Sequence, residues 1–324
     1  MRRWFPSVRL VPILAAAACA PDGAEVGDSA APSYEDPTAP GAYDVDRSDI
    51  SLALGTSRAG LPSTLPASLY VPDRGGDALP VILFHHGFAT APSAYHATLT
   101  HLASHGFVVV APTFDSGFTN TRTHAGLAED ATAIFSWLQQ NALPTDATLA
   151  LSSFGQFGHS RGGKASLLTA ASDTRVGGTF VFDPVDAGPP FGAFDEADYP
   201  SVAPELAPSI GAPVAQVGAG RGPEGVVPCA PAGENFAAYW DAYPAGARQI
   251  VADRAGHTDL LDVCADGTGG TTCTLCPPGD DPGATATLVR GAVVAFFAEA
   301  LEGDTRFAGW WSTTAADGVR YETK

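Results

Sequence analysis

Short runs rich in Val, Ile, Leu, Phe and Ala recur along the chain. They occupy residues 79–84, 106–112, 179–183, 213–218 and 248–252. The first two runs are almost wholly apolar and lack the alternation of polar and apolar positions that marks a strand with one solvent-facing side. Continuous apolar strands are typical of parallel sheets, because helices cover both faces of such a sheet. The pattern therefore predicts the strands of a mostly parallel central sheet.

Segments whose apolar residues have helical spacing lie between and after these runs. The spacing predicts helices over 92–104, 126–141 and 284–301. In the second of these, Leu127 and Ile134 fall on one face of the helix. Strands that alternate with helices over such a length predict an α/β fold, a mostly parallel central sheet with helices on both faces.

The N-terminal pattern differs and predicts an export signal at residues 1–20. Arg2 and Arg3 form a basic start, residues 10–18 are apolar, and the small residues of 16–20 fit a cleavage site. The apolar run is too short to span a bilayer permanently. We therefore expect an exported protein with no transmembrane span in the mature chain.

The fate of the leader depends on Cys19. This residue stands where a bacterial lipoprotein carries its lipidated cysteine, but Leu14 lies too far upstream for a good lipobox. A lipid anchor at Cys19 and release as a secreted or periplasmic protein therefore both stay open.

The composition changes again after the leader. Residues 21–46 are rich in Pro, Ala, Gly and acidic residues, which predicts a solvated linker. Residues 47–324 are then expected to form a single domain. Within it, residues 186–208 show no clear period and are expected to form a loop beside the functional site.

Composition and charge limit the class of partner. Of the 324 residues, 45% are hydrophobic, which is ample for a large core. The formal net charge is −18, from 35 acidic residues against 17 Lys and Arg. Nucleic acids and anionic membrane surfaces would repel such a chain, so we expect neither as a partner. The oligomeric state stays open.

Four cysteines remain once the leader is set aside: Cys229, Cys264, Cys273 and Cys276. In an exported protein an even number of cysteines favours two disulfides, and three connectivities are open. The last two cysteines have the spacing of a zinc or redox motif. No second pair of that spacing accompanies them, so we favour disulfides.

The strongest functional signal is the sequence Gly-His-Ser-Arg-Gly at residues 158–162. An apolar segment precedes it, and residues 163–171 have the composition of a helix. A serine on a tight turn between a strand and a helix is a nucleophile elbow, and the flanking glycines leave room for the turn. We therefore predict Ser160 as a catalytic nucleophile.

Serine needs a general base and a carboxylate that orients the base. His257 is the only histidine beyond the elbow, so it is the base by elimination. Asp183 ends a predicted strand and is the first candidate for the acid, because catalytic groups collect at the carboxyl edge of such sheets. Asp186 and Glu224 stay open as alternatives.

An oxyanion hole requires two N–H groups directed at the developing negative charge. We expect one from Arg161, which follows the nucleophile, and the other from Phe88, which follows Gly87 at the end of an early strand. His85 and His86 invite a metal interpretation. No acid or third histidine stands at ligand spacing, so we expect neither a metal nor a cofactor.

Taken together, these motifs resemble those of the chlorophyllase branch of the α/β-hydrolases. The matching segments are 80–88, 103–112, 158–164, 182–186, 228–231 and 256–262. The resemblance implies an α/β-hydrolase fold and a serine esterase with a Ser-Asp-His triad, and it favours Asp183 as the acid. The leader, the acidic linker and the cysteine-bearing segment 264–276 depart from plant chlorophyllases, which cleave the phytyl ester of chlorophyll.

The sequence therefore predicts a serine carboxylic-ester hydrolase that acts on a hydrophobic ester through an acyl-enzyme. Phe88, Phe191 and Phe194 suggest an apolar substrate side. Two alternatives stay open. One is a lipase-, cutinase- or polyesterase-like enzyme for insoluble esters, and the other is a non-catalytic surface binding protein on a hydrolase scaffold.

Overall fold

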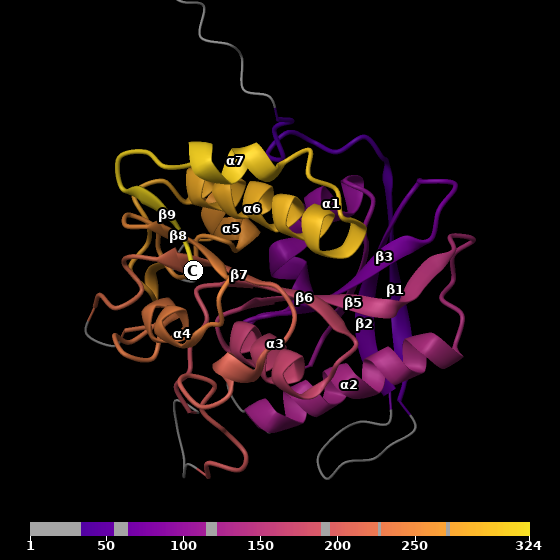
Figure 1. The fold of residues 1–324 in the computed structure, drawn as a ribbon, viewed down its shortest axis with the longest axis horizontal. Coiled ribbons are helices and arrows are strands. Elements are labelled where there is room, and N and C mark those ends of the chain that lie inside the picture. Colours follow the sequence, from indigo (N-terminus) through magenta and orange to yellow (C-terminus); the bar gives the residue numbers. More distant parts are fainter. Residues whose placement is uncertain (1–33, 55–63, 115–121, 189–194, 226–227, 270–272) are drawn as a thin grey trace, which may run out of the picture. The chain divides into compact units, whose positions relative to one another are not determined.

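The computed structural model describes residues 34–54, 64–114, 122–188, 195–225, 228–269 and 273–324 (Figure 1). The predicted export signal with Cys19, and the predicted substrate-side residues Phe191 and Phe194, lie outside these ranges.

The described residues form one sheet of nine strands in the order β1-β2-β4-β3-β5-β6-β7-β8-β9. The strands are β1 (Val45–Ala53), β2 (Thr64–Pro72), β3 (Leu79–His85), β4 (Val108–Pro112), β5 (Leu149–His159), β6 (Val176–Phe182), β7 (Val214–Ala219), β8 (Arg248–Ala252) and β9 (Val319–Thr323). Strands β4, β3, β5, β6, β7 and β8 run parallel to one another, whereas β1, β2 and β9 pair antiparallel at the two edges. The prediction of a mostly parallel sheet is confirmed.

Helices pack on both faces of this sheet, as predicted. They are α1 (His96–Ser104), α2 (His124–Gln140), α3 (Arg161–Ser172), α4 (Phe236–Ala242), α5 (Asp262–Ala265), α6 (Pro282–Glu302) and α7 (Ala308–Thr313), with 3-10 turns η1 (Pro92–Tyr95) and η2 (Ala207–Ser209). Helices α2, α3 and α4 lie on one face, and α1, α5, α6 and α7 lie on the other (Figure 1).

The apolar run at 79–84 shows why helices must pack on both faces of the sheet. In β3, Ile82 and Phe84 belong to the core under α1 and α6, whereas Val81 and Leu83 belong to the core under α2 and α3. Successive side chains of a strand point to opposite faces, so a strand buried on both sides must be apolar at every position.

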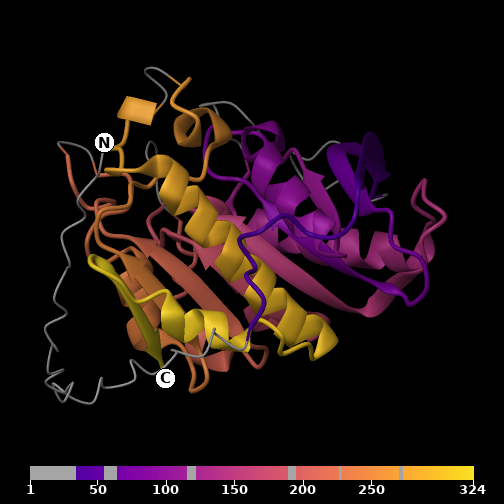
Figure 2. The same cartoon turned by 90° about the horizontal axis from the view of Figure 1, so that it is seen from above.

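Helix α6 is, within the described ranges, the one helix long and apolar enough to cross a membrane. It lies instead along one face of the sheet (Figure 2), where Val289, Val293 and Phe297 are completely buried. Its N-cap is Asp281, whose side chain accepts from the Ala284 N–H, and it ends at Gly303 with a φ of 67°. Its apolar character serves the core.

The segment before β1 packs against the domain. His101 donates to the Pro37 carbonyl (2.9 Å) and His105 donates to the Ala39 carbonyl (3.0 Å). The sequence pattern assigns residues 21–46 to a solvated linker, but Tyr34 bonds to Thr313 of α7, residues 37–43 bond to α1 and the residue after it, and β1 begins at Val45. Composition does not reveal this docking, because backbone carbonyls make the contacts.

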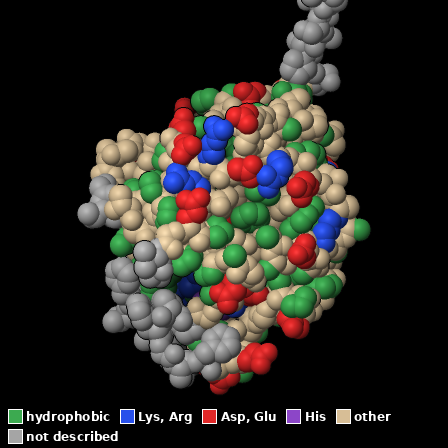
Figure 3. All heavy atoms as spheres, turned by 90° about the vertical axis from the view of Figure 1, so that its left-hand side faces the viewer, with side chains coloured by type: hydrophobic (Ala, Val, Ile, Leu, Met, Phe, Trp, Pro, Cys, Tyr) green, Lys and Arg blue, Asp and Glu red, His purple; other side chains and the backbone are tan. Residues whose placement is uncertain are grey.

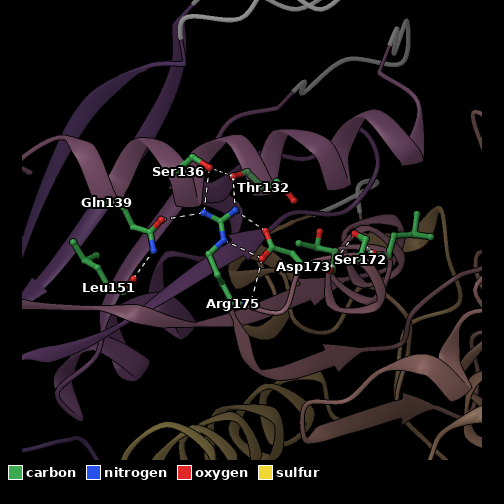
Figure 4. A network of polar contacts seen from close by, with 9 residues as sticks. Thr132, Ser136, Gln139, Leu151, Ser172, Asp173 and Arg175 are labelled. Carbon is green, nitrogen blue, oxygen red and sulfur yellow. Dashed lines mark hydrogen bonds and ion pairs between the residues drawn. The ribbon is translucent and has the colours of Figure 1, made fainter.

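A network around Arg175 holds the helices of one face together (Figure 4). Its guanidinium donates to both carboxylate oxygens of Asp173, at 2.6 and 2.9 Å. It also reaches α2 through the Thr132 carbonyl (3.0 Å), Ser136 and Gln139 (both 3.1 Å). Arginine suits this role because its donors form a planar fork. The network ties α2 to the turn between α3 and β6.

Charged side chains of opposite sign lie beside one another at the surface. On the face seen in Figure 3, the few basic side chains are interspersed with acidic ones. Among the contacts of the described residues, whichever face they occupy, Arg320 pairs with Asp253 (2.6 Å) and Arg254 pairs with Asp317 (3.0 Å). Exposed pairs of this kind contribute little to stability, about 0 to 1 kcal/mol.

Two disulfides join the four cysteines of the described residues. They are Cys229–Cys276 and Cys264–Cys273, one of the three connectivities that the sequence leaves open. The first links segments 47 residues apart in the chain. Disulfides persist in oxidising compartments, so both bonds agree with a location outside the cytosol.

Candidate active site

Strand β5 leads directly into a strained turn at Ser160. The residue has φ 57° and ψ −125°, a conformation that few residues other than glycine adopt. Its N–H donates to the Phe182 carbonyl (3.1 Å), and helix α3 starts at the next residue. An observed outlier of this kind at a strand-to-helix turn is the geometry of a nucleophile elbow.

The two glycines of the pentapeptide are required by close approach. A methyl group on Gly158 would overlap the Gly162 carbonyl, and one on Gly162 would overlap the His85 carbonyl at the end of β3. The first turn of α3 therefore lies directly against the segment that follows β3. Both segments were predicted to line the oxyanion hole.

Three side chains from separate segments meet at the elbow. The Ser160 hydroxyl lies 2.9 Å from His257 Nε2, and His257 Nδ1 lies 2.5 Å from Asp183 Oδ2. All three residues are buried, and Asp183 is completely so. Because the carboxylate accepts at Nδ1, the neutral ring carries its proton there and presents the Nε2 lone pair to the serine.

Asp183 is held in place by two strands. It directly follows β6, its N–H donates to the Val217 carbonyl (2.8 Å), and its Oδ1 accepts from the Ala219 N–H (3.1 Å). Its φ of 41° turns the chain sharply at the end of the strand. The carboxylate therefore has one oxygen for the backbone and one for His257.

The two other candidate acids lie elsewhere. Asp186 forms a buried ion pair with Lys164, with 3.2 Å between Oδ1 and Nζ. Glu224 pairs with Arg221 at the surface, and 53% of its side chain is exposed. Of the three carboxylates left open by the sequence, only Asp183 contacts the histidine.

The segments predicted for the oxyanion hole are also adjacent. Arg161 is the first residue of α3, so its N–H belongs to the helix turn that has no acceptor within the helix. The Arg161 guanidinium lies over the Phe88 ring, 5.7 Å from its centre. The segment after β3 and the start of α3, which carry the two predicted donors, thus lie against each other next to Ser160.

Comparison with known proteins identifies the family of this chain. The family model described as Chlorophyllase matches residues 36–309. Chlorophyllase-2 of Arabidopsis thaliana is 31% identical over 243 residues, which cover 70% of this chain and 75% of that protein. Chlorophyllase-1 of the same plant is 32% identical over 242 residues, 69% of this chain and 73% of that protein. The chain belongs to the chlorophyllase family.

Membership confirms the resemblance drawn from the motifs and the α/β-hydrolase fold. The protein is therefore a carboxylic ester hydrolase. The match with the chlorophyllase family begins at residue 36, inside the segment that docks on α1, and continues through the cysteine-bearing segment 264–276.

Two further groups support the candidate site: Lys164, to which the sequence pattern assigns no role, and Asp259, whose closeness to His257 in the sequence predicts a loop-stabilising role. Lys164 is completely buried, and its ammonium donates to the Asp186 carbonyl (2.7 Å) besides pairing with the carboxylate. The Asp186 carboxylate in turn accepts from the N–H groups of Val202 and Ala203 and from the Ser201 hydroxyl. The Lys164–Asp186 pair therefore connects helix α3 to residues 201–203. A lysine beside a nucleophile elbow was the available signal.

The second support is Asp259, which is completely buried beneath the His257 loop. It accepts from the N–H groups of Gly256 (2.8 Å) and Gly279 (3.0 Å). Burial raises the pKa of this carboxyl. These bonds join the histidine loop to the segment that follows Cys276.

His85 and His86 serve the interior of the protein. His86 Nδ1 donates to the Gly87 carbonyl (2.9 Å), and its Nε2 accepts from the Phe114 N–H (3.2 Å). His85 stacks on the Phe114 ring, 5.0 Å away. Within the described ranges, no three His, Cys, Asp or Glu side chains gather in a way that could hold a metal.

The buried histidines predict a loss of stability in mild acid. Burial lowers the pKa of both His85 and His86 to about 3. In the unfolded chain the pKa is near 6.5, so below about pH 6.5 only the unfolded state takes up these protons. The free energy of unfolding should therefore fall from pH 7 to pH 5, as measured by denaturant titration. His85→Phe, which keeps an aromatic ring against Phe114 but does not titrate, should weaken this dependence. An unchanged stability between the two pH values would contradict the prediction.

Proposed function

We propose that this protein is a serine esterase in which Ser160 is the nucleophile, His257 the general base and Asp183 the orienting acid. The observation that carries the proposal is the unbroken contact from the serine hydroxyl through both ring nitrogens to a buried carboxylate. This arrangement activates a hydroxyl that is a weak nucleophile at its own pKa.

The geometry supports a two-stage reaction. In the first stage Ser160 Oγ attacks the ester carbonyl while His257 Nε2 takes the hydroxyl proton. The tetrahedral intermediate collapses, the ester C–O bond breaks, and His257 passes the proton to the leaving alcohol. Water then attacks the acyl-enzyme with His257 again as base, and the acid is released.

The negative charge of each intermediate needs donors already in position. We infer that the N–H groups of Phe88 and Arg161 supply them, because the segments that carry both residues lie beside Ser160. The start of α3 adds the positive end of the helix dipole. Losing one such donor typically costs about 10² to 10³ in kcat.

We also propose that the ester is hydrophobic. The relatives are named chlorophyllases, which supports an ester with a large apolar part as the substrate class. The Phe88 ring beside the nucleophile turn would offer an apolar contact.

A panel of esters tests this preference. We expect the purified enzyme to hydrolyse long-chain nitrophenyl esters and chlorophyll with higher kcat/KM than nitrophenyl acetate. The panel should include polyester film, which would reveal a lipase- or cutinase-like activity on insoluble substrates. Equal kcat/KM for acetate and long-chain esters would contradict the hydrophobic preference.

The disulfides and the leader support export. Cys229–Cys276 and Cys264–Cys273 require an oxidising compartment to form stably. Residues 1–20 carry the composition of an export signal. Mass spectrometry of the mature N-terminus would distinguish a lipid-modified Cys19 from a simple cleavage, and a full-length chain would exclude both.

A further inference from the structure

His159 precedes the nucleophile but does not belong to the proposed triad. Only 2% of its surface is exposed, and its ring stacks on Phe182. Its Nδ1 lies 2.7 Å from the Tyr95 hydroxyl oxygen, and its Nε2 lies 2.9 Å from the main-chain carbonyl oxygen of His257. This buried ring therefore contacts the backbone of the proposed base.

The contacts fix where the protons lie. A carbonyl oxygen can only accept, so His159 Nε2 carries a proton and donates it to His257. The neutral ring then has a lone pair on Nδ1, which accepts from the Tyr95 hydroxyl. Burial lowers the pKa of His159 well below its usual value and raises the pKa of Tyr95 to about 12. Both residues therefore keep these protonation states near neutral pH.

Tyr95 extends the chain of bonds to the loop after β3. Its hydroxyl oxygen accepts from the Gly87 N–H (3.1 Å). Thr90 braces the same turn, because its hydroxyl donates to the Gly87 carbonyl (2.9 Å). The order of donors is thus Gly87 N–H to Tyr95, Tyr95 O–H to His159, and His159 Nε2–H to the His257 carbonyl.

We propose that Tyr95 and His159 are positioning residues that hold the oxyanion loop and the His257 loop in a fixed relation to each other. The proposal rests on the proposed function of His257 and Phe88. The Gly87 N–H that bonds to Tyr95 directly precedes the Phe88 N–H that we propose as an oxyanion donor.

The relation matters because both loops act on the same transition state. The oxyanion loop must place an N–H donor about 3 Å from the oxyanion, and the His257 loop must place Nε2 within hydrogen-bonding distance of the Ser160 hydroxyl. A misplacement of about 1 Å can cost about 10²-fold in rate. A relay that connects the two loops would therefore affect kcat more than substrate binding.

Two substitutions remove the hydrogen bonds of Tyr95 and His159 but keep an aromatic ring at each position. Tyr95→Phe removes the hydroxyl and keeps the ring that packs on Phe84, and His159→Phe removes both nitrogens and keeps the stack on Phe182. We expect each to lower kcat about 10- to 100-fold and to change KM less than about twofold. Affinity for a boronic acid that mimics the tetrahedral intermediate should fall with kcat/KM.

The double variant tests the link itself. Because the two residues act in one chain, Tyr95→Phe with His159→Phe should cost little more than the larger single effect. His159→Gln should recover part of the activity, since its amide can still donate to the His257 carbonyl. Tyr70→Phe is a matched control, because it removes another buried hydroxyl bonded to a histidine ring, that of His96 (3.3 Å), on strand β2. Its kcat should stay within about twofold of the parent.

Several results would overturn the proposal. Tyr95→Phe with kcat within about twofold of the parent would do so, as would a loss carried by KM alone or single effects that multiply in the double variant. If Tyr70→Phe lowers kcat as much as Tyr95→Phe does, the effect comes from core packing and not from the hydrogen bonds of Tyr95. If His159→Phe does not fold, Tyr95→Phe and His159→Gln decide alone. Ser160→Ala distinguishes failure of the proposed function from failure of the positioning role. Activity in Ser160→Ala would contradict the proposed function. An inactive Ser160→Ala together with a fully active Tyr95→Phe would contradict only the positioning role of Tyr95 and His159.

Discussion

Ser160→Ala is expected to abolish ester hydrolysis, with kcat lowered by about 10⁶-fold. The variant leaves His257 and Asp183 in place but removes the oxygen that attacks the carbonyl. Any residual rate over the uncatalysed reaction would come from the oxyanion donors and from binding. Hydrolysis of a nitrophenyl ester measures the loss, and a fluorophosphonate probe with mass spectrometry should label Ser160 only in the parent enzyme.

The fold of this variant should be intact, because the elbow turn is set by the glycines and by the bond from the residue 160 N–H to Phe182. Ser172→Ala is the matched control: Ser172 ends α3, and its hydroxyl donates to the Leu168 carbonyl (3.0 Å). We expect the control to keep full activity. More than about 1% of parental kcat in Ser160→Ala would contradict the nucleophile assignment and would favour another catalytic group. No labelling of the parent enzyme would favour a non-catalytic scaffold.

The central strands could be predicted because burial on both faces leaves a simple trace in the sequence. Strand β3 was expected at 79–84 and spans Leu79–His85, and β8 was expected at 248–252 and spans Arg248–Ala252. The long helices followed for a similar reason, since α2 and α6 each bury a wide apolar face. Residues in these elements obey one strong constraint, which local pattern reveals.

The short and peripheral elements could not be predicted in this way. Strand β9, for example, is an edge strand with no fully buried residue, and α5 has only four residues. Edge strands and single-turn helices gain their stability from contacts distant in sequence, here the pairing of β9 with β8. Their own residues carry little signal.

The candidate site shows the same division. The Gly-His-Ser-Arg-Gly turn is local, and His257 follows from the absence of any other histidine beyond it. The contact of Asp183 with His257 depends on residues 74 positions apart, and the pairing of Asp186 with Lys164 depends on residues 22 apart. The sequence indicated that both carboxylates lie near the site, but it could not indicate which of them pairs with Lys164.

The second large effect is expected from Asp183→Asn, which should lower kcat about 10⁴-fold with little change in KM. The Ala219 N–H donates to Asp183 Oδ1 (3.1 Å), so in the variant the amide oxygen should stay on that side. The amide NH₂ would then face His257 Nδ1, which must become an acceptor. The ring proton would move to Nε2, and His257 could no longer take the proton of Ser160.

The expected loss comes from the change of His257 tautomer, so it should appear in the reaction rate and not in the stability of the protein. The kcat of Asp183→Asn and its rate of fluorophosphonate labelling should fall together, while the unfolding temperature changes little. Glu224→Gln is the control, because Glu224 is an exposed residue that pairs with Arg221, and its substitution should leave kcat within about twofold of the parent. If Asp183→Asn keeps more than a tenth of parental kcat while Glu224→Gln is inactive, the acid lies after β7 instead of after β6, and the hydrogen bond from Asp183 to His257 serves only the fold.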